Sequence, residues 1–290
     1  MAKLFVILTA HNPLERFDTT LRVLQEYGTF SVDVEAEIFI DHDSEKDVST
    51  LRELIDANVS KTKVGITVAD PCYTGYSLCW AHKALLKQKV RDRYADYYMY
   101  SENDMLFRDE NFCYWLDEKD SLKRKNLEPG FCRFERVGED KIPFDNFRRW
   151  SLLGPTPACW GDIPHYGQFT LTPYRMDMMG FVSLGNPYAG LMILDQEDAE
   201  KYVKSPACDP QKSYAMTGKR NWPIADRSSM GLCFSGLRPE QEHRRVVPVV
   251  YGDESLVVAD YALVEHLDTK YSQALLTESD IITTDTMLAH

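Results

Sequence analysis

The sequence contains no apolar run long enough to cross a membrane. The longest one near the N-terminus, residues 4–8, is too short for a signal sequence or a membrane-spanning helix, and polar residues follow it at once. No internal repeat and no low-complexity tract interrupts the chain. We therefore expect a soluble, cytoplasmic protein without a membrane span.

Cysteines are present, but they form no C-x-x-C pair. The seven cysteines are irregularly spaced, at positions 72, 79, 113, 132, 159, 208 and 233. The odd count and the irregular spacing argue against a disulfide framework and against a structural zinc site. We expect most of them to be small buried hydrophobic side chains in a reducing compartment.

Basic residues are too few to give the chain a positive charge. The 33 basic and 45 acidic residues leave a formal net charge of −12. Because a phosphate backbone requires a basic surface, nucleic acid is not an expected partner. A nucleotide sugar remains compatible with this charge if a metal ion offsets it locally. The 290 residues, 44% of them hydrophobic, are enough for one large domain or two small ones.

Strand and helix patterns alternate along the first half of the chain. The continuous apolar run at residues 3–9 is typical of a central parallel strand, and further strands are predicted at residues 35–40 and 64–68. Apolar residues at helical spacing predict helices over residues 16–27, 47–57 and 78–91. This order predicts an α/β fold with an open mixed sheet flanked by helices. An irregular aromatic-rich region follows at residues 136–173, and a loop of that length is usually functional.

Two carboxylates interrupt an apolar stretch at residues 97–107. Glu102 and Asp104 are one residue apart, with apolar residues on both sides of them. Burying unpartnered charges at a strand end is costly. Two such carboxylates suit a hard divalent cation, Mn²⁺ or Mg²⁺, which prefers oxygen ligands and often binds substrate phosphates as well. The alternative is a solvated acidic turn after an edge strand.

Polar residues follow the first two strands as well. The first strand runs into Ala10, His11 and Asn12, and the second runs into Asp41 and Asp43. Ligands of open α/β sheets bind at the carboxyl ends of the strands. The sequence therefore predicts a ligand site that combines these ends with the acidic cluster.

Gly75 and Lys83 precede and begin the helix predicted before the acidic cluster. A glycine lets a ligand approach the backbone, and a lysine near a helix N-terminus suits a phosphate or a sugar hydroxyl. The alternative is a capped amphipathic helix with a surface lysine.

These segments, in this order, resemble the GT-A class of nucleotide-sugar glycosyltransferases. Glu102-Asn103-Asp104 stands where that class carries its D-x-D motif, although it opens with Glu instead of Asp. Residues 264–271, VEHLDTKY, resemble the late segment in which a histidine supplies a further metal ligand, which here is His266. The resemblance covers the first half of the chain and only these short segments of the second half.

The resemblance implies a metal-dependent glycosyltransferase that moves a sugar from a nucleotide-diphosphate sugar to the hydroxyl of a glycan or other acceptor. It implies a donor-binding half over residues 1–128 and an acceptor-binding half over residues 129–290, within one continuous domain. The aromatic-rich middle would shape the acceptor site, and Mn²⁺ or Mg²⁺ would be held by Asp104, Glu102 and His266. The donor would contact a set of polar positions near the strand ends: Thr9, Ala10, His11, Asn12, Arg16, Asp41, Asp43, Gly75, Lys83 and Asn103.

An inverting transfer also needs a carboxylate that accepts the proton of the attacking hydroxyl. We expect this catalytic base to be Asp226, at the start of a predicted helix, with Glu135 and Asp195 as further candidates because each follows a predicted strand. The alternative role of Asp226 is to cap that helix.

Three other functions remain open. A sugar-phosphate nucleotidyltransferase would share the sheet and the metal, but it would carry a Gly-rich basic loop after the first strand, where this chain has residues 11–14, HNPL. A metal-dependent phosphate-ester hydrolase would release phosphate without an acceptor. A non-enzymatic sugar-binding module would need neither metal nor nucleotide.

Overall fold

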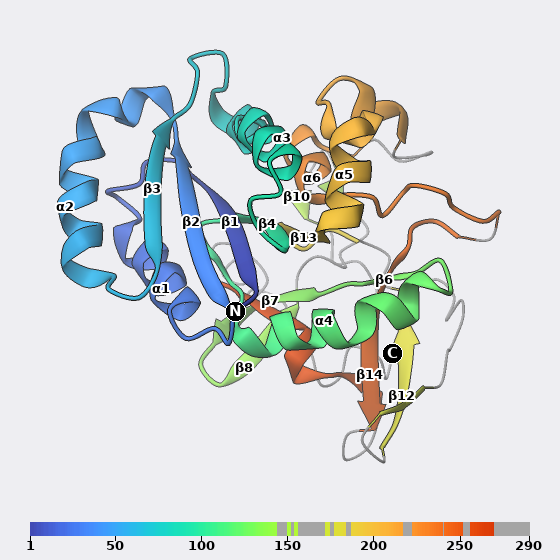
Figure 1. The fold of residues 1–290 in the computed structure, drawn as a ribbon. Coiled ribbons are helices and arrows are strands. Elements are labelled where there is room, and N and C mark those ends of the chain that lie inside the picture. The colour runs from blue at the N-terminus through green and yellow to red at the C-terminus, as the bar shows by residue number, and fades with distance from the viewer. Residues whose placement is uncertain are drawn as a thin grey trace. The chain divides into compact units, whose positions relative to one another are not determined.

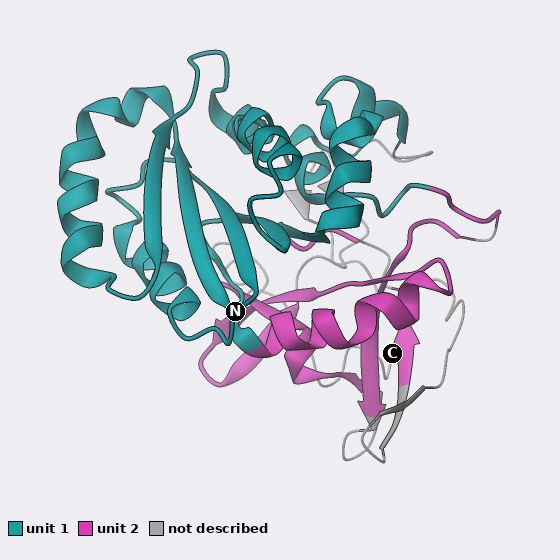
Figure 2. Cartoon of the chain, viewed as in Figure 1, with its two compact units in different colours: residues 1–109, 190–235 teal, residues 110–189, 236–290 magenta. Residues whose placement is uncertain are grey.

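The chain forms two compact units (Figure 2). The computed structural model describes residues 1–143, 150–151, 154–155, 172–174, 177–183, 187–216, 222–239, 241–251 and 256–269. Unit 1 comprises Met1–Asp109 and Gly190–Ser235, and unit 2 comprises Glu110–Ala189 and Gly236–His290. The boundary after Asp109 precedes the boundary at residue 128 expected for the donor half, and that functional division stays a prediction.

Unit 1 is built around a five-stranded sheet with helices on both faces (Figure 1). The strands of this sheet are β1 (Lys3–Ala10), β2 (Asp33–Ile40), β3 (Lys63–Val68), β4 (Tyr97–Glu102) and β13 (Leu191–Asp195). Unit 1 also contains the short strand β5 (Met105–Leu106), which is not part of this sheet. Its α-helices are α1 (Phe17–Tyr27), α2 (Val48–Asn58), α3 (Lys83–Arg91), α5 (Gln196–Lys204) and α6 (Ile224–Ser229). Its 3-10 helices are η1 (His42–Asp47), η2 (Gly75–Trp80), η4 (Pro206–Cys208) and η5 (Lys212–Met216).

The strand order in this sheet is β13-β4-β1-β2-β3. The pairs β1–β2, β2–β3 and β1–β4 are parallel, whereas β13 runs antiparallel to β4. The predicted open mixed α/β sheet flanked by helices is therefore confirmed. The chain moves from β1 toward β3 and then returns past β1 to β4. Because crossovers between parallel strands are right-handed, this reversal places successive helices on opposite faces of the sheet.

The alternation of side chains along β1 divides the core between the two faces. Phe5 and Ile7 belong to a buried cluster that also contains Leu86 of α3 and Tyr202 of α5. Their neighbours in sequence point to the other face, where α1 and α2 lie (Figure 1). Both faces are covered, which explains why β1 is apolar along its whole length.

The helix predicted over residues 78–91 is divided in the structure. A 3-10 helix, η2, precedes α3, and Gly75 begins it with a φ of +52°. The hydroxyl of Ser77 accepts a hydrogen bond from the backbone N–H of Thr74 and stabilises this start. Trp80 at the end of η2 donates its indole N–H to the carbonyl of Ile224 at 2.8 Å. A contact with a distant segment fixes this part of the chain, and helical periodicity gives no sign of such a contact.

Unit 2 contains one long helix and short strands. These are α4 (Asp109–Lys123), β6 (Glu128–Pro129), β7 (Cys132–Val137), β8 (Asp140–Pro143), β9 (Trp150–Ser151), β10 (Gly154–Pro155), β11 (Thr172–Tyr174), β12 (Asp177–Val182), β14 (Arg245–Tyr251), β15 (Leu256–Val258), the 3-10 helix η6 (Asp260–Ala262) and β16 (Leu263–His266). Tyr114 of α4 packs edge-to-face on Phe131, with ring centroids 5.7 Å apart, a separation usual for such pairs. Most of residues 136–173, the expected acceptor region, lie outside the described residues.

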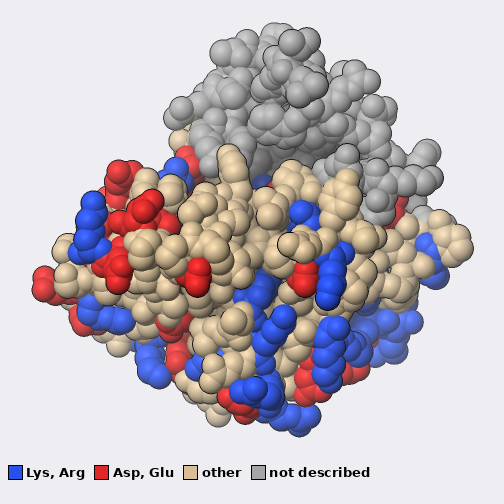
Figure 3. Space-filling model, turned by 90° about the horizontal axis from the view of Figure 1, so that it is seen from above, with Lys and Arg blue, Asp and Glu red and all other residues tan. Residues whose placement is uncertain are grey.

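Acidic and basic side chains are interspersed on the face drawn in Figure 3. Asp and Glu gather at one side of that face, and Lys and Arg lie in patches separated by other residues. Within the described residues, no helix is both long enough and apolar enough to cross a membrane.

Candidate functional site

The parallel strands of unit 1 have their carboxyl ends at one edge of the sheet. β1 ends at Ala10 and β4 ends at Glu102, and Thr9 pairs with Glu102 across the two strands. The order of connections reverses between β1 and β4, so their ends form a topological switch point. In open α/β sheets, ligands bind in the crevice at such a point.

Asp41, directly after β2, fixes the turn that follows β1. One of its carboxylate oxygens accepts hydrogen bonds from the backbone N–H and the hydroxyl of Ser44, at 3.1 and 3.0 Å. The other accepts from the backbone N–H of Asn12 and lies next to His11 Nδ1, both at 3.1 Å. Burial acts against ionisation of Asp41, but these hydrogen bonds prevail and lower its pKa. Asp41 therefore holds an ionised carboxylate behind the turn.

The turn itself presents polar side chains at the sheet edge. Asn12 adopts a φ of +49°, which is uncommon for a residue with a side chain, and Asn is among the residues that tolerate it best. The side chain of His11 is 61% exposed, and Asp43 in η1 is exposed as well. His11 and Asn12 are thus placed by Asp41 beside the end of β1, as a ligand site would require.

The acidic turn after β4 is held against β1 and α1. The backbone N–H of Asn103 donates to the carbonyl of Thr9 at 3.2 Å, and its side-chain amide donates to the hydroxyl of Thr20 at 2.8 Å. Asp104 is 6% exposed, and its carboxylate lies 3.8 Å from the guanidinium of Arg16. β1 and α1 therefore fix Asn103, and Arg16 lies beside the carboxylate of the next residue, Asp104.

Asp104 and Glu102 are the residues of unit 1 that could hold a divalent cation. Asp104 lies beside a positive charge, the Arg16 guanidinium, and a metal requires the ionised form of a carboxylate. Within the described ranges, no group of three or more His, Cys, Asp or Glu side chains is close enough together to form a metal site from the protein alone. Two carboxylates with substrate phosphates and water are nevertheless a usual ligand set for Mg²⁺.

A buried tyrosine links the end of β1 to α6. The hydroxyls of Tyr100 and Thr9 are 3.0 Å apart, and the Tyr100 ring stacks on His82 with centroids 4.3 Å apart. Burial raises the pKa of Tyr100 well above its usual value, and hydrogen bonds from Thr9 and Ser228 act against that shift. Ser228 lies in α6, so this helix reaches the same region of unit 1 as the end of β1.

Lys83 also contacts α6. Its ammonium donates to the carbonyl of Ser228 at 2.8 Å and lies 5.0–5.4 Å from the centroids of three aromatic rings, of which that of Tyr202 is the nearest. The side chain is 5% exposed, and burial lowers its pKa to about 8. Lys83 was predicted to contact a phosphate or a sugar hydroxyl, but in this structure its ammonium is engaged by a backbone carbonyl of the protein.

Gly75 and Asp226 have the backbone positions that the sequence suggests. Gly75 stands at the start of η2, and no atom lies within 4 Å of the position that a Cβ would take there. A glycine is therefore favoured by the positive φ of this residue and not by close packing. Asp226 lies in the first turn of α6, whose N-cap is Pro223. A negative charge in a first turn is favourable, but Asp226 is not the capping residue that the alternative role required.

Asp195 and Glu135 are the other two candidate bases. Asp195 ends β13 and pairs with Tyr97 at the amino end of β4, about 17 Å along that strand from Glu102. Its carboxylate accepts the backbone N–H of Asp198 and caps α5. β13 runs antiparallel to β4 and delivers its carboxyl end to the edge opposite the ends of β1 and β4. The role of Asp195 as a base stays a prediction.

Glu135 and His266 form a buried pair in unit 2. Glu135 Oε1 lies 2.8 Å from His266 Nδ1, and the two residues are 0% and 2% exposed. An ionised carboxylate only accepts, so in that form Glu135 takes a hydrogen bond from Nδ1–H of His266. Such a carboxylate partner is the usual orienting contact of a metal-binding histidine. The metal-ligand role of His266 stays a prediction.

Sequence reasoning missed Tyr100 and Arg227, the latter in a hollow beside α6. In the sequence Tyr100 is only one residue of an apolar strand, because the partner of its hydroxyl, Thr9, is far away along the chain. Arg227 stands next to Asp226, and a charged residue beside the candidate base was a signal that could have drawn attention to it.

Comparisons with known proteins give distant structural likenesses only. No family model and no curated protein sequence matches the chain. Among solved structures, 4-diphosphocytidyl-2C-methyl-D-erythritolsynthase from Anaerococcus prevotii DSM 20548 aligns with a TM-score of 0.33 at 10% identity, covering 70% of this chain and 76% of the other. S. aureus TarS 1–349 aligns with a TM-score of 0.39 at 11% identity, covering 94% and 63%. Its complex with UDP aligns with a TM-score of 0.30 at 14% identity, covering 51% and 40%. The aligned part thus spans less than two thirds of these TarS chains.

Proposed function

We propose that this chain is a metal-dependent glycosyltransferase that moves a sugar from a nucleotide-diphosphate sugar to a hydroxyl acceptor. The observation that carries the proposal is the acidic turn at the switch point of the unit 1 sheet. Asp104 is buried there beside Arg16, on a turn fixed to β1 through Asn103. A fixed carboxylate at the place where ligands of such sheets bind suits a bound divalent cation and a diphosphate.

In this proposal, the residues of unit 1 position the donor and stabilise its leaving group. His11 and Asn12, held by Asp41, contact the nucleoside part at the end of β1. A bound Mn²⁺ or Mg²⁺ supplies Lewis-acid stabilisation of the diphosphate as negative charge develops on it. Arg16, whose side chain is 45% exposed and lies 3.8 Å from Asp104, adds a positive charge beside the diphosphate. Asp226 on α6 is the proposed base for the acceptor hydroxyl.

One feature favours glycosyl transfer over nucleotidyl transfer. An enzyme of the second kind needs a loop after the first strand whose backbone N–H groups and basic side chains surround a triphosphate. Here the backbone N–H of Asn12 is already donated to Asp41, and a carboxylate stands behind the turn. A carboxylate at that position repels a triphosphate.

The proposal is tested by calorimetric titration of nucleoside diphosphates with and without Mn²⁺. We expect binding that depends on Mn²⁺, and a loss of at least about tenfold in the metal-dependent affinity for Asp104→Asn, because the substitution removes a charged ligand. Asp18→Asn, at an exposed position of α1, is the matched control and should bind as the parent does. Unchanged Mn²⁺ dependence in Asp104→Asn would overturn the metal assignment.

A second measurement separates the reaction classes. Incubation with nucleotide sugars and simple glycan acceptors should release nucleoside diphosphate only when the acceptor is present. Release of pyrophosphate from a nucleoside triphosphate and a sugar phosphate would instead identify a nucleotidyltransferase. Release of phosphate without any acceptor would identify a hydrolase.

A further inference from the structure

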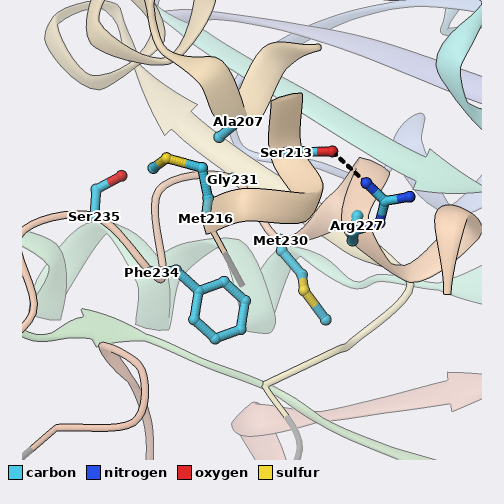
Figure 4. Close-up of a pocket in the computed structure, with 8 residues that line it drawn as sticks. All are labelled: Ala207, Ser213, Met216, Arg227, Met230, Gly231, Phe234 and Ser235. Atoms are coloured by element: carbon cyan, nitrogen blue, oxygen red, sulfur yellow. Dashed lines mark hydrogen bonds between the residues drawn. The ribbon is translucent and has the colours of Figure 1, made fainter. Parts of the chain in front are cut away.

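A narrow hollow lies in unit 1 beside α6, and one arginine lines it (Figure 4). Arg227 and Ser213 supply its polar wall, and Met216, Met230 and Phe234 supply its apolar wall. The hollow admits a group of a few atoms and not a whole sugar ring.

The guanidinium of Arg227 is only partly satisfied. Its Nη1 donates to the carbonyl of Pro210 and to the hydroxyl of Ser213, both at 2.8 Å. Its Nε is buried and has no hydrogen-bond partner in the part of the chain that the structure describes. Leaving a buried charged donor without an acceptor is costly, so such groups usually serve a ligand or an ordered water.

Arg227 also has no carboxylate partner among the described residues. This is unusual in a chain with 45 acidic and only 33 basic residues. Lys83, which donates to Ser228 on the same helix, likewise contacts a carbonyl and aromatic rings instead of a carboxylate. Two cations therefore act on α6, and each donates its hydrogen bonds to carbonyl or hydroxyl oxygens.

Exposed aromatic rings flank this region. The Tyr214 ring is 5.5 Å from the Arg227 guanidinium, and Tyr214 is 52% exposed. Tyr76 is 83% exposed on η2, the element that packs on α6. Exposed tyrosines present flat apolar faces on which a sugar ring can stack.

We propose that the Arg227 hollow binds an anionic group, a phosphate or a carboxylate, carried by a saccharide acceptor. The planar guanidinium suits both groups because its N–H donors match two oxygens of the anion. The acceptor role rests on the proposed glycosyl transfer, whereas the binding of the anion does not. Ser228, next to Arg227 in α6, hydrogen-bonds Tyr100, whose hydroxyl lies 3.0 Å from that of Thr9 near the end of β1.

The test of anion binding uses the Nε–H signal of Arg227 in ¹H–¹⁵N spectra of the full chain, without nucleotide or metal. Arg227→Lys identifies the signal by its loss. Inorganic phosphate and acetate are titrated separately, and the anion that saturates the shift at the lower concentration is the preferred group. We expect a saturable shift, and a loss of affinity of about tenfold or more in Arg227→Gln. The Nε–H of Arg93, whose guanidinium pairs with Glu200 on the surface, should not shift and serves as the control.

The outcomes separate the two proposals. If neither anion shifts the Arg227 signal saturably, the hollow holds water and the inference is wrong, whatever the donor assays show. If an anion binds, acceptor sugars with and without the matching phosphate or carboxylate are compared in transfer assays. A preference for the charged sugar that Arg227→Gln reduces supports the acceptor role, and an equal rate with both sugars refutes it. Anion binding without any sugar transfer would leave the anion site in place and contradict the proposed function.

Discussion

Burial of the Lys83 ammonium predicts that the stability of unit 1 rises with pH in the alkaline range. The residue is 5% exposed, and burial lowers its pKa from 10.5 to about 8. Below pH 8 the lysine is charged in both the folded and the unfolded chain. Between pH 8 and 10.5 the unfolded chain binds more protons than the folded one, so unfolding becomes less favourable as the pH rises. A shift of this size corresponds to a free energy of unfolding of about 3 kcal/mol.

The assay compares the parent with Lys83→Met by urea denaturation from pH 7 to 10.5. The difference in the free energy of unfolding should change by about 3 kcal/mol in favour of the parent as the pH rises above 8. Groups that titrate in both proteins cancel in this difference. Lys61→Met, at an exposed position, should show a difference that does not vary with pH. A pH-independent difference for Lys83→Met would refute the reasoning, since it would mean that the ammonium is hydrated.

The remaining predictions concern three carboxylates and one histidine. Glu35, 14% exposed at the side chain, has a pKa lowered to about 2, because hydrogen bonds from Lys3 and Tyr94 outweigh the opposing effect of burial. Glu35→Gln should therefore cost about 2 kcal/mol at pH 7 in urea melts, and the cost should vanish as the pH falls from 4.5 toward 2; a constant cost would contradict this. If His266 ligates a metal, Glu135→Gln should weaken Mn²⁺ affinity by about tenfold or more in calorimetry without changing the far-UV spectrum, and an unchanged affinity would make the pair purely structural. Asp226→Asn should keep donor binding but lower the transfer rate about a hundredfold, and transfer at the parent rate would exclude Asp226 as the base.

The fold could be predicted from the sequence because its signals are local. The continuous apolar run of β1 and the helical spacing in α1 and α2 arise from neighbours in sequence, and these elements are present in the structure within a few residues, whereas the helix predicted over residues 78–91 is divided. The polar turn after β1 and Asp41 after β2 were expected at one sheet edge, and hydrogen bonds join them there. Parallel strands fix this proximity once their order is known.

The contacts around α6 could not be predicted, because they join distant parts of the chain. Thr9, Tyr100 and Ser228 approach one another only after β4 has paired with β1 and α6 has packed on η2. Trp80 and Lys83 both use their polar atoms on carbonyls of residues 224–228, and backbone carbonyls carry no sequence signal. The orientation of β13 was also hidden, since an apolar run does not indicate strand direction, and that direction decides at which edge of the sheet Asp195 lies.

Residues 190–235 return to unit 1, so the edge of the sheet formed by the ends of β1 and β4 and the helix α6 are parts of one folding unit. β13 covers the outer edge of β4 and buries four consecutive apolar side chains, Leu191 to Leu194, each at most 8% exposed. Each such side chain contributes about 1.5–3 kcal/mol, so the four together are comparable with the whole stability of a domain, about 5–15 kcal/mol. Without this segment, β4 would end the sheet, and Tyr100 and Trp80 would lose the partners that bury them. The strand that carries Glu102 and the helix that carries Asp226 and Arg227 are thus stabilised by the same core, and a change in the packing of β13 must alter both together.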